Sequence, residues 1–205
     1  FVQTVQEWPL IMGHFPMKDK DGYYNFAKAF TEININVSKW KTQDMVAKRQ
    51  IEDGDNTHEG WVMINDLVSK GYKYQAACQL ATLKPDRLTA RQVANGDENE
   101  FFENIEYGKR IHEVLKDRFG EGDDKTIKTK EFTKEIVLSL QKLTYKKGME
   151  WATGIMEEFI NTLSDKEVAD IKNAKSTKVQ RKDEKRKQIL DKAFSFFLGQ
   201  NNIKL

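Results

Sequence analysis

This chain has few of the residues that mark disulfide-rich, secreted or membrane-spanning proteins. Its single cysteine, Cys78, excludes an internal disulfide framework and fits a reducing compartment such as the cytoplasm. No run of about 18 apolar residues occurs, so we expect no membrane span, and no signal peptide is recognisable. Only three prolines are present, two of them before residue 17, so little interrupts helices further along the chain.

Charges of the two signs nearly cancel. The 205 residues include 34 basic and 32 acidic side chains, which leaves a net charge of +2. Bulk charge therefore does not indicate a nucleic-acid partner, and any electrostatic attraction must come from local clusters. With 32% charged and 39% hydrophobic residues, the chain can form one domain, or two small ones, with a heavily solvated surface.

Motifs for metal binding and catalysis are lacking. The three histidines are scattered and no cysteine pair accompanies them: His14, His58 and His112. Asp19–Gly22 imitates the middle of a calcium loop, but Met17 and Lys28 then occupy its first and last ligand positions. The glycine-rich segment Gly120–Asp123 is acidic and would repel a phosphate. Cys78 lies on an apolar helix side, which is typical of a buried, inert thiol. We therefore expect no metal, no cofactor and no enzymatic activity.

Apolar residues recur at helical spacing through most of the chain. This spacing predicts amphipathic helices over Tyr23–Phe30, Trp61–Val68, Phe101–Phe119, Phe132–Leu143 and Met149–Leu163. Ser164 and Glu167 form a capping-box pair that begins another helix, and Lys178–Leu198 predicts a charged final one. The only β-branched alternation, Ile33–Val37, is short. The sequence therefore predicts an all-α multi-helix bundle of about eight or nine helices, with the Met149–Leu163 helix at its centre.

Three segments differ in character. Residues 1–22 contain two of the prolines and predict an irregular N-terminal segment, residues 23–163 a helical core domain, and residues 164–205 charged C-terminal helices. Because residue 1 is Phe rather than Met, we expect residues 1–22 to be the end of a longer N-terminal region.

The stretch Tyr74–Gly96 has the pattern of a helix-turn-helix-like pair. A short helix with a small-residue face is followed by a break at Pro85 and by a second helix that Asn-Gly closes. Leu88 and Val93 are expected to pack inward. Residue types that contact phosphates and base edges lie in its second half: Lys84, Arg87, Thr89, Arg91, Gln92 and Asn95. The acidic run Asp97–Glu100 opposes such contacts, and a purely structural corner is the alternative.

A second basic cluster lies near the C-terminus. Lys172–Lys187 contains eight Lys or Arg residues against only Asp183 and Glu184. Three of the basic residues are expected to lie along nucleic-acid phosphates: Lys178, Arg181 and Lys182. The alternative is a solvated connection between two helices.

Several short motifs occur in an order found in a known family. Asn36–Asp44 (NVSKWKTQD) precedes Gly71–Tyr74, which leads into the helix pair, and Asn95–Asp97 then precedes a long helix. Over Phe26–Leu143 this order resembles the C-terminal helical part of ParB-like proteins of phages, plasmids and mobile elements. The resemblance implies a non-enzymatic, DNA-binding part with duplex DNA as its partner. The family's DGxHR and GxxRxxA motifs are absent, so its nucleotide-binding or nuclease activity is not carried over to any residue.

The competing interpretation is a helical structural or interaction subunit of a phage particle or other assembly. Its partner would be another protein or a second copy of the chain. Long amphipathic helices support it, as do four tryptophans that suit interface anchors: Trp8, Trp40, Trp61 and Trp151. Basic residues gathered on one face favour nucleic acid, whereas a large apolar patch favours a protein partner.

Overall fold

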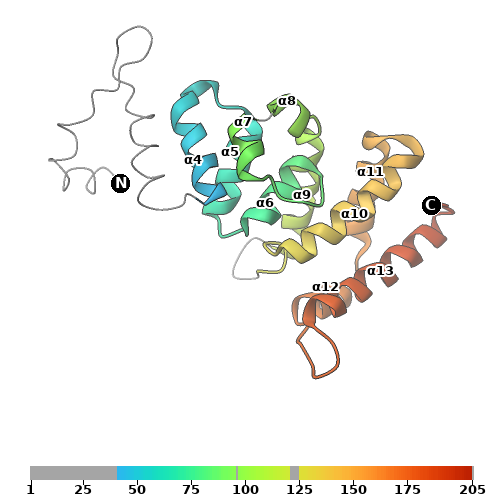
Figure 1. Cartoon of the computed structure of the whole chain (residues 1–205). Coiled ribbons are helices and arrows are strands. Elements are labelled where there is room, and N and C mark those ends of the chain that lie inside the picture. The colour runs from blue at the N-terminus through green and yellow to red at the C-terminus, as the bar shows by residue number, and fades with distance from the viewer. Residues whose placement is uncertain (1–40, 96, 121–124, 205) are drawn as a thin grey trace, which may run out of the picture.

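The computed structural model describes residues 41–95, 97–120 and 125–204, and this part of the chain contains helices and no strand (Figure 1). The predicted all-α fold is therefore confirmed. The predicted irregular segment 1–22, the helix over Tyr23–Phe30 and the alternation Ile33–Val37 lie outside the described residues. None of the described helices has the length and apolar character needed to cross a membrane.

The described residues form ten α-helices, α4 to α13, with a single 3-10 turn at Gly54–Asn56. The first six are α4 (Thr42–Asp53), α5 (Glu59–Ser69), α6 (Tyr74–Thr82), α7 (Ala90–Asn95), α8 (Glu98–Phe101) and α9 (Ile105–Phe119). The last four are α10 (Lys130–Lys147), α11 (Met149–Thr162), α12 (Asp165–Lys172) and α13 (Lys182–Gln200). In Figure 1 the first six gather in the upper part of the molecule, while α12 and α13 lie at its lower right.

Helix α6 is the most enclosed element of the core. Every residue from Ala76 to Thr82 is buried, and α5, α9 and α10 all pack against this helix. A Cβ atom added at Gly108 of α9 would lie 2.1 Å from the backbone oxygen of Leu80, so this close approach requires glycine. The small-residue face of α6 thus does admit a neighbouring helix. Helix α11, the predicted centre, packs against α9 and α10 but keeps an exposed side at Glu158 and Asn161.

Two predicted helices differ from the observed ones. The stripe that starts at Phe101 is divided into α8 and α9, because the chain turns at residues 102–104. Phe102 of this turn is buried with its ring in edge-on contact with Trp61, at a centroid distance of 4.7 Å. The last helix begins at Lys182 rather than Lys178, because residues 177–180 form a turn. Phe102 continues the apolar pattern through the first break, so periodicity alone does not reveal it.

The C-terminal helices share the core of the remaining chain. Phe159 of α11 contacts Phe194 and Phe197 of α13, with ring centroids 4.9 and 5.7 Å apart. The predicted capping box at the start of α12 is confirmed: the Glu167 backbone N–H donates to Ser164 Oγ (3.2 Å), and Ser164 N–H donates to Glu167 Oε2 (2.8 Å). Residues on both sides of position 163 therefore belong to one buried hydrophobic cluster.

Candidate nucleic-acid interface

The connection between α6 and α7 is longer than a helix-turn-helix turn. Residues 83–89 run back along α6, because Gln79 Nε2 donates to the Pro85 carbonyl (2.6 Å) and Tyr74 Oη donates to the Leu88 carbonyl (3.1 Å). Leu88 and Val93 are buried, as predicted. Helix α7 has only six residues. The chain breaks around Pro85 as predicted, but the connection spans residues 83–89 and is not a tight turn, and α7 is short for a helix that reads a groove.

Two of the predicted base-contacting residues instead cap α7. Thr89 and Gln92 bond each other, since Thr89 N–H and Oγ1–H both donate to Gln92 Oε1 at 2.9 Å. In return, Gln92 N–H donates to Thr89 Oγ1 at 3.3 Å. This is a capping box, which occupies the amide oxygen that would otherwise accept a hydrogen bond from a base. The side chain of Asn95 lies outside the described part of the structure.

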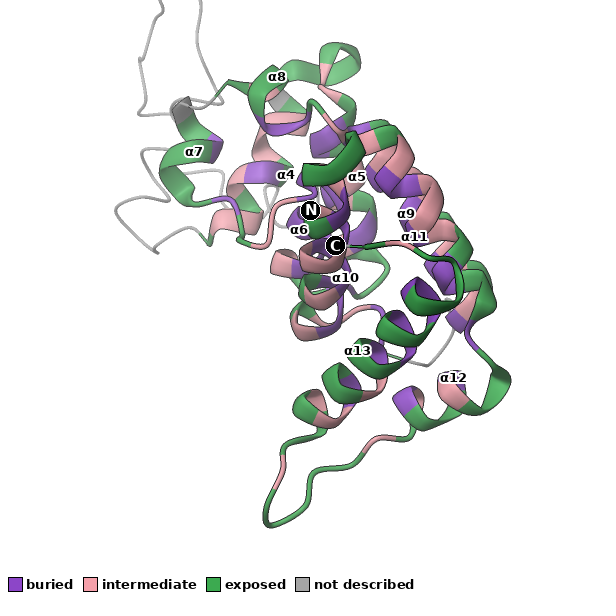
Figure 2. Ribbon diagram, turned by 90° about the vertical axis from the view of Figure 1, so that its right-hand side faces the viewer, coloured by how far each residue is buried: buried purple, intermediate pink, exposed green. Residues whose placement is uncertain are grey.

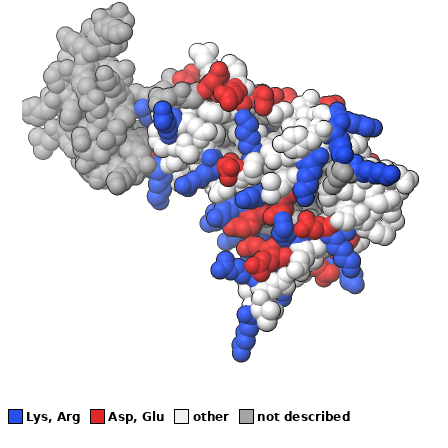
Figure 3. Space-filling view, turned by 45° about the vertical axis from the view of Figure 1, so that its right-hand side comes forward, with Lys and Arg blue, Asp and Glu red and all other residues white. Residues whose placement is uncertain are grey.

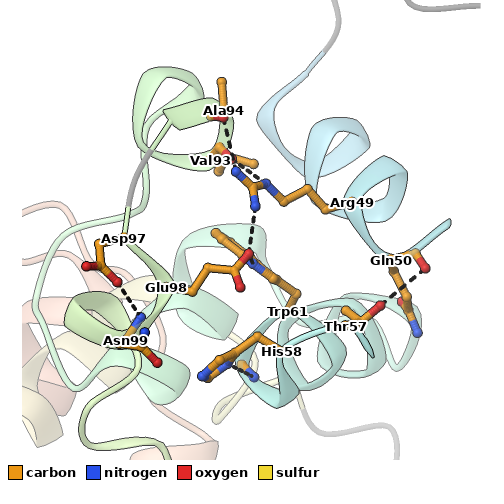
Figure 4. Close-up of polar contacts among 11 residues, drawn as sticks. Arg49, Gln50, Thr57, His58, Trp61, Val93, Ala94, Asp97, Glu98 and Asn99 are labelled. Atoms are coloured by element: carbon orange, nitrogen blue, oxygen red, sulfur yellow. Dashed lines mark hydrogen bonds and ion pairs between the residues drawn. The ribbon is translucent and has the colours of Figure 1, made fainter. Parts of the chain in front are cut away.

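Arg49 closes the other end of α7 (Figure 4). Its guanidinium donates to the carbonyls of Val93 (2.6 Å) and Ala94 (3.0 Å), which are left without partners at a helix C-terminus. The same group pairs with Glu98 at 2.6 Å. Glu98 also accepts the Trp61 indole N–H at 2.6 Å, so the network joins α4, α5, α7 and α8. No sequence pattern pointed to Arg49, because its partners are more than forty residues away.

The cations that precede and begin α7 differ in exposure and partners. Arg87 and Arg91 are exposed, whereas the Lys84 ammonium donates to the carbonyl of Glu100 at 3.3 Å. Asp97 caps α8 by accepting the Asn99 N–H at 2.9 Å. The α6–α7 corner, defined as residues 74–100 together with Arg49, which bonds them, therefore carries mixed charge and contacts that mostly serve the fold.

The connection between α12 and α13 differs from the α6–α7 corner because it contains basic residues and no acidic ones. We call residues 173–181 the basic loop; no acidic residue occurs between Asp170 and Asp183. In Figure 2 this connection is exposed and extends away from the body of the protein. Its cations, together with the first residue of α13, are all exposed: Lys175, Lys178, Arg181 and Lys182. In the part of the chain that the structure describes, the ammonium groups of Lys175, Lys178 and Lys182 have no hydrogen bond or ion pair.

Hydrogen bonds hold the two limbs of the basic loop together. Thr177 N–H donates to the Gln180 carbonyl (2.8 Å), and Gln180 N–H donates to Thr177 Oγ1 (3.1 Å). Nearer the body, Lys182 N–H donates to Ser176 Oγ (3.1 Å). Lys178 therefore lies at the tip of a hydrogen-bonded turn. Ser176 and Thr177, which precede Lys178, are residue types that favour turns.

Arg186 anchors the base of the basic loop. Its Nε donates to the Ile171 carbonyl at the end of α12 (3.0 Å), and its Nη2 donates to Thr126 Oγ1 (2.9 Å). Both interpretations of Lys172–Lys187 expected its basic residues to be exposed. For Arg186 this prediction is wrong, because its side chain is buried. Lys187, counted in the same cluster, pairs with Glu135 of α10.

The two predicted basic clusters lie far apart. In Figures 1 and 2, α7 is near the top of the molecule, whereas the α12–α13 connection is at the bottom. In Figure 3, basic side chains reach the narrow lower end, below a band of mixed charge. The structure therefore does not combine the residues of the α6–α7 corner and those of the basic loop into one surface.

The described histidines and the cysteine make internal contacts, whereas His14 lies outside the described residues. His58 Nδ1 accepts the Gly60 N–H at the start of α5 (3.1 Å), and His112 Nε2 lies 3.0 Å from Tyr72 Oη. Cys78 is buried, as predicted, and burial raises the pKa of its thiol to about 11. Among the described residues, no three His, Cys, Asp or Glu side chains are grouped so that they could hold a metal ion.

Comparison with known proteins does not identify a relative. No protein family, no curated protein and no solved structure matches this chain.

Proposed function

We propose that this protein binds duplex DNA by its phosphate backbone, through the basic loop. The observation that carries the proposal is a projecting turn without acidic residues, which together with Lys182 at the start of α13 presents four exposed cations. Phosphate contacts supply most of the affinity of non-specific DNA binding, and they require cations that are free to replace condensed counterions. The resemblance to ParB-like proteins points to the same ligand.

The basic loop is already held in one conformation, so it should lose little conformational entropy when it binds DNA. The hydrogen bonds across residues 176–182 fix the turn before any ligand arrives, and Arg186 fixes its base. Prior ordering lowers the conformational entropy lost on association. The α6–α7 corner contributes little to this function, because the side chains of Thr89 and Gln92 cap α7 and do not reach out to bases.

Salt dependence tests the proposal. Neutralising about four phosphates with Lys175, Lys178, Arg181 and Lys182 gives a log–log slope of affinity against salt near −3.6. Fluorescence anisotropy with a short labelled duplex, in about 50 to 200 mM salt, measures that slope. Lys178→Ala should flatten it by about one unit for every duplex sequence alike. No affinity at low salt, or a slope that Lys178→Ala does not change, would refute phosphate binding by the loop.

The alternative, a helical interaction subunit, has weaker support. Trp61 is fully buried, so it cannot anchor a partner. Ile51 and Phe196 are large exposed apolar side chains, but they lie singly on α4 and α13. Isolated exposed apolar residues are common on monomeric proteins. Light scattering after size-exclusion chromatography tests this alternative, which requires a mass above that of one chain.

A further inference from the structure

The outer face of α10 carries an exposed tyrosine among lysines. Lys142, Tyr145 and Lys146 are spaced at i, i+3 and i+4, so they share one side of the helix, and Lys134 lies two turns earlier along it. Tyr145 is 88% exposed, the second most exposed large apolar side chain in the part of the chain described here. We call these four residues the α10 stripe.

The α10 stripe is free of internal partners. All three lysines are exposed, and neither they nor Tyr145 makes a hydrogen bond, ion pair or ring contact with any described residue. The neighbouring Gln141, by contrast, donates to the Leu83 carbonyl (3.3 Å), so it faces the body of the protein.

No acidic residue lies close to Lys142 or Lys146 in the sequence, whereas Lys134 directly precedes Glu135. The sequence has no Asp or Glu between Glu135 and Glu150. Glu135 is paired with Lys187, and Glu150 is paired with Arg110 at 2.9 Å. Positive charge at a helix C-terminus is stabilised by the helix dipole, which accounts for lysines here but not for the exposed aromatic ring.

We infer that the α10 stripe is a binding site for single-stranded nucleic acid. An unpaired base stacks on the Tyr145 ring, and phosphates on either side contact Lys142 and Lys146. Proteins that bind single strands without sequence preference combine aromatic side chains, on which bases stack, with a row of basic residues that contacts the phosphates. Lys134, about 12 Å further along the helix axis, extends the track toward α12 and α13. The site uses none of the residues of the basic loop, so it goes beyond duplex binding.

The test uses the full chain and a labelled oligo(dT) strand. Tyr145→Ala should weaken binding roughly tenfold, whereas Tyr145→Phe, which keeps the ring, should bind as the wild type does. Phe196→Ala is the matched control, because it removes an exposed aromatic ring outside the stripe. Photo-crosslinking with 5-iodouracil in the strand, followed by mass spectrometry, should place the crosslink on Tyr145.

Two comparisons separate this inference from the proposed function. Replacing Lys175, Lys178 and Lys182 by Ala should weaken duplex binding strongly, whereas the crosslink between oligo(dT) and Tyr145 should persist. Polyglutamate of equal charge should compete poorly with oligo(dT), because it offers no base to stack. Unchanged oligo(dT) binding by Tyr145→Ala, equal competition by polyglutamate, or no oligo(dT) binding by the wild type would overturn the inference.

Discussion

The α6–α7 corner and the basic loop contain similar residue types. Their polar side chains differ in whether they are hydrogen-bonded within the fold or exposed to solvent. In the corner, Arg49 and Lys84 donate to backbone carbonyls, and Thr89 and Gln92 bond each other. In the basic loop, backbone and hydroxyl groups make the internal hydrogen bonds, and the ammonium groups stay in solvent. A cation is available to a ligand only where the fold does not already use it.

Three arginines donate hydrogen bonds to carbonyls at helix ends and are therefore not available to a ligand. Arg49 bonds the last carbonyls of α7, Arg118 bonds the carbonyl of Leu163 after α11 (3.0 Å from Nε), and Arg186 bonds that of Ile171 in α12. Unpaired carbonyls at a helix C-terminus favour such a donor. A count of basic residues therefore overstates the positive charge that this protein presents to a partner.

The largest expected effect comes from detaching the helix that carries the basic loop. Phe159→Ala removes a buried ring that contacts Phe194 and Phe197 of α13, so it should cost about 3–5 kcal/mol of unfolding free energy. Urea denaturation measures the change. Phe196→Ala, at an exposed position on α13, should stay within about 0.5 kcal/mol of wild type. Equal losses for the two variants would show that α13 does not depend on this packing.

Breaking the corner should have an intermediate effect. Arg49→Ala leaves two helix-end carbonyls and the Glu98 carboxylate without their donor, which should cost about 1–2 kcal/mol. The figure is discounted because the Arg49 side chain is 24% exposed to screening solvent. Arg91→Ala, also in the corner but exposed, should change the urea midpoint little. A midpoint for Arg49→Ala equal to that of Arg91→Ala would show that the network is unimportant.

Alkaline pH should lower the unfolding free energy through Cys78 and Tyr74, two residues of the α6–α7 corner. Burial raises the pKa of the Cys78 thiol from 9.0 to about 11 and also raises the pKa of Tyr74. The folded protein thus keeps protons that the unfolded chain releases, so stability is full below pH 9 and declines as pH rises toward 11. Cys78→Ala should reduce this decline, as urea midpoints at the two pH values would reveal. A decline of the same size in both proteins would exclude Cys78 as a source.

The smallest effect on stability is expected for a substitution in the basic loop. Lys178→Ala removes an exposed side chain without an internal partner, so the unfolding free energy should stay within about 0.5 kcal/mol of wild type. Thermal melting checks this result. A clear loss of stability would mean that Lys178 has a structural role.

Local sequence signals predicted much of the fold and less of the candidate site. The Trp61–Val68 stripe and the Ser164–Glu167 capping box depend on neighbours in sequence, and α5 and α12 formed as expected. Arg49 and Arg186 bond partners that only tertiary packing brings near, so no local pattern reveals them. The basic loop was recognisable by composition, but its turn and its separation from α7 were not.

One paired comparison tests the central claim that the basic loop, and not α7, holds the phosphates. Salt slopes for duplex binding are measured for Lys178→Ala/Lys182→Ala and for Arg87→Ala/Arg91→Ala, each of which removes two exposed cations. The loop variant should flatten the slope by about 1.8 units, at about 0.9 per phosphate contact, while the corner variant keeps the wild-type slope. The reverse result, a flattened slope for the corner variant alone, would contradict the account.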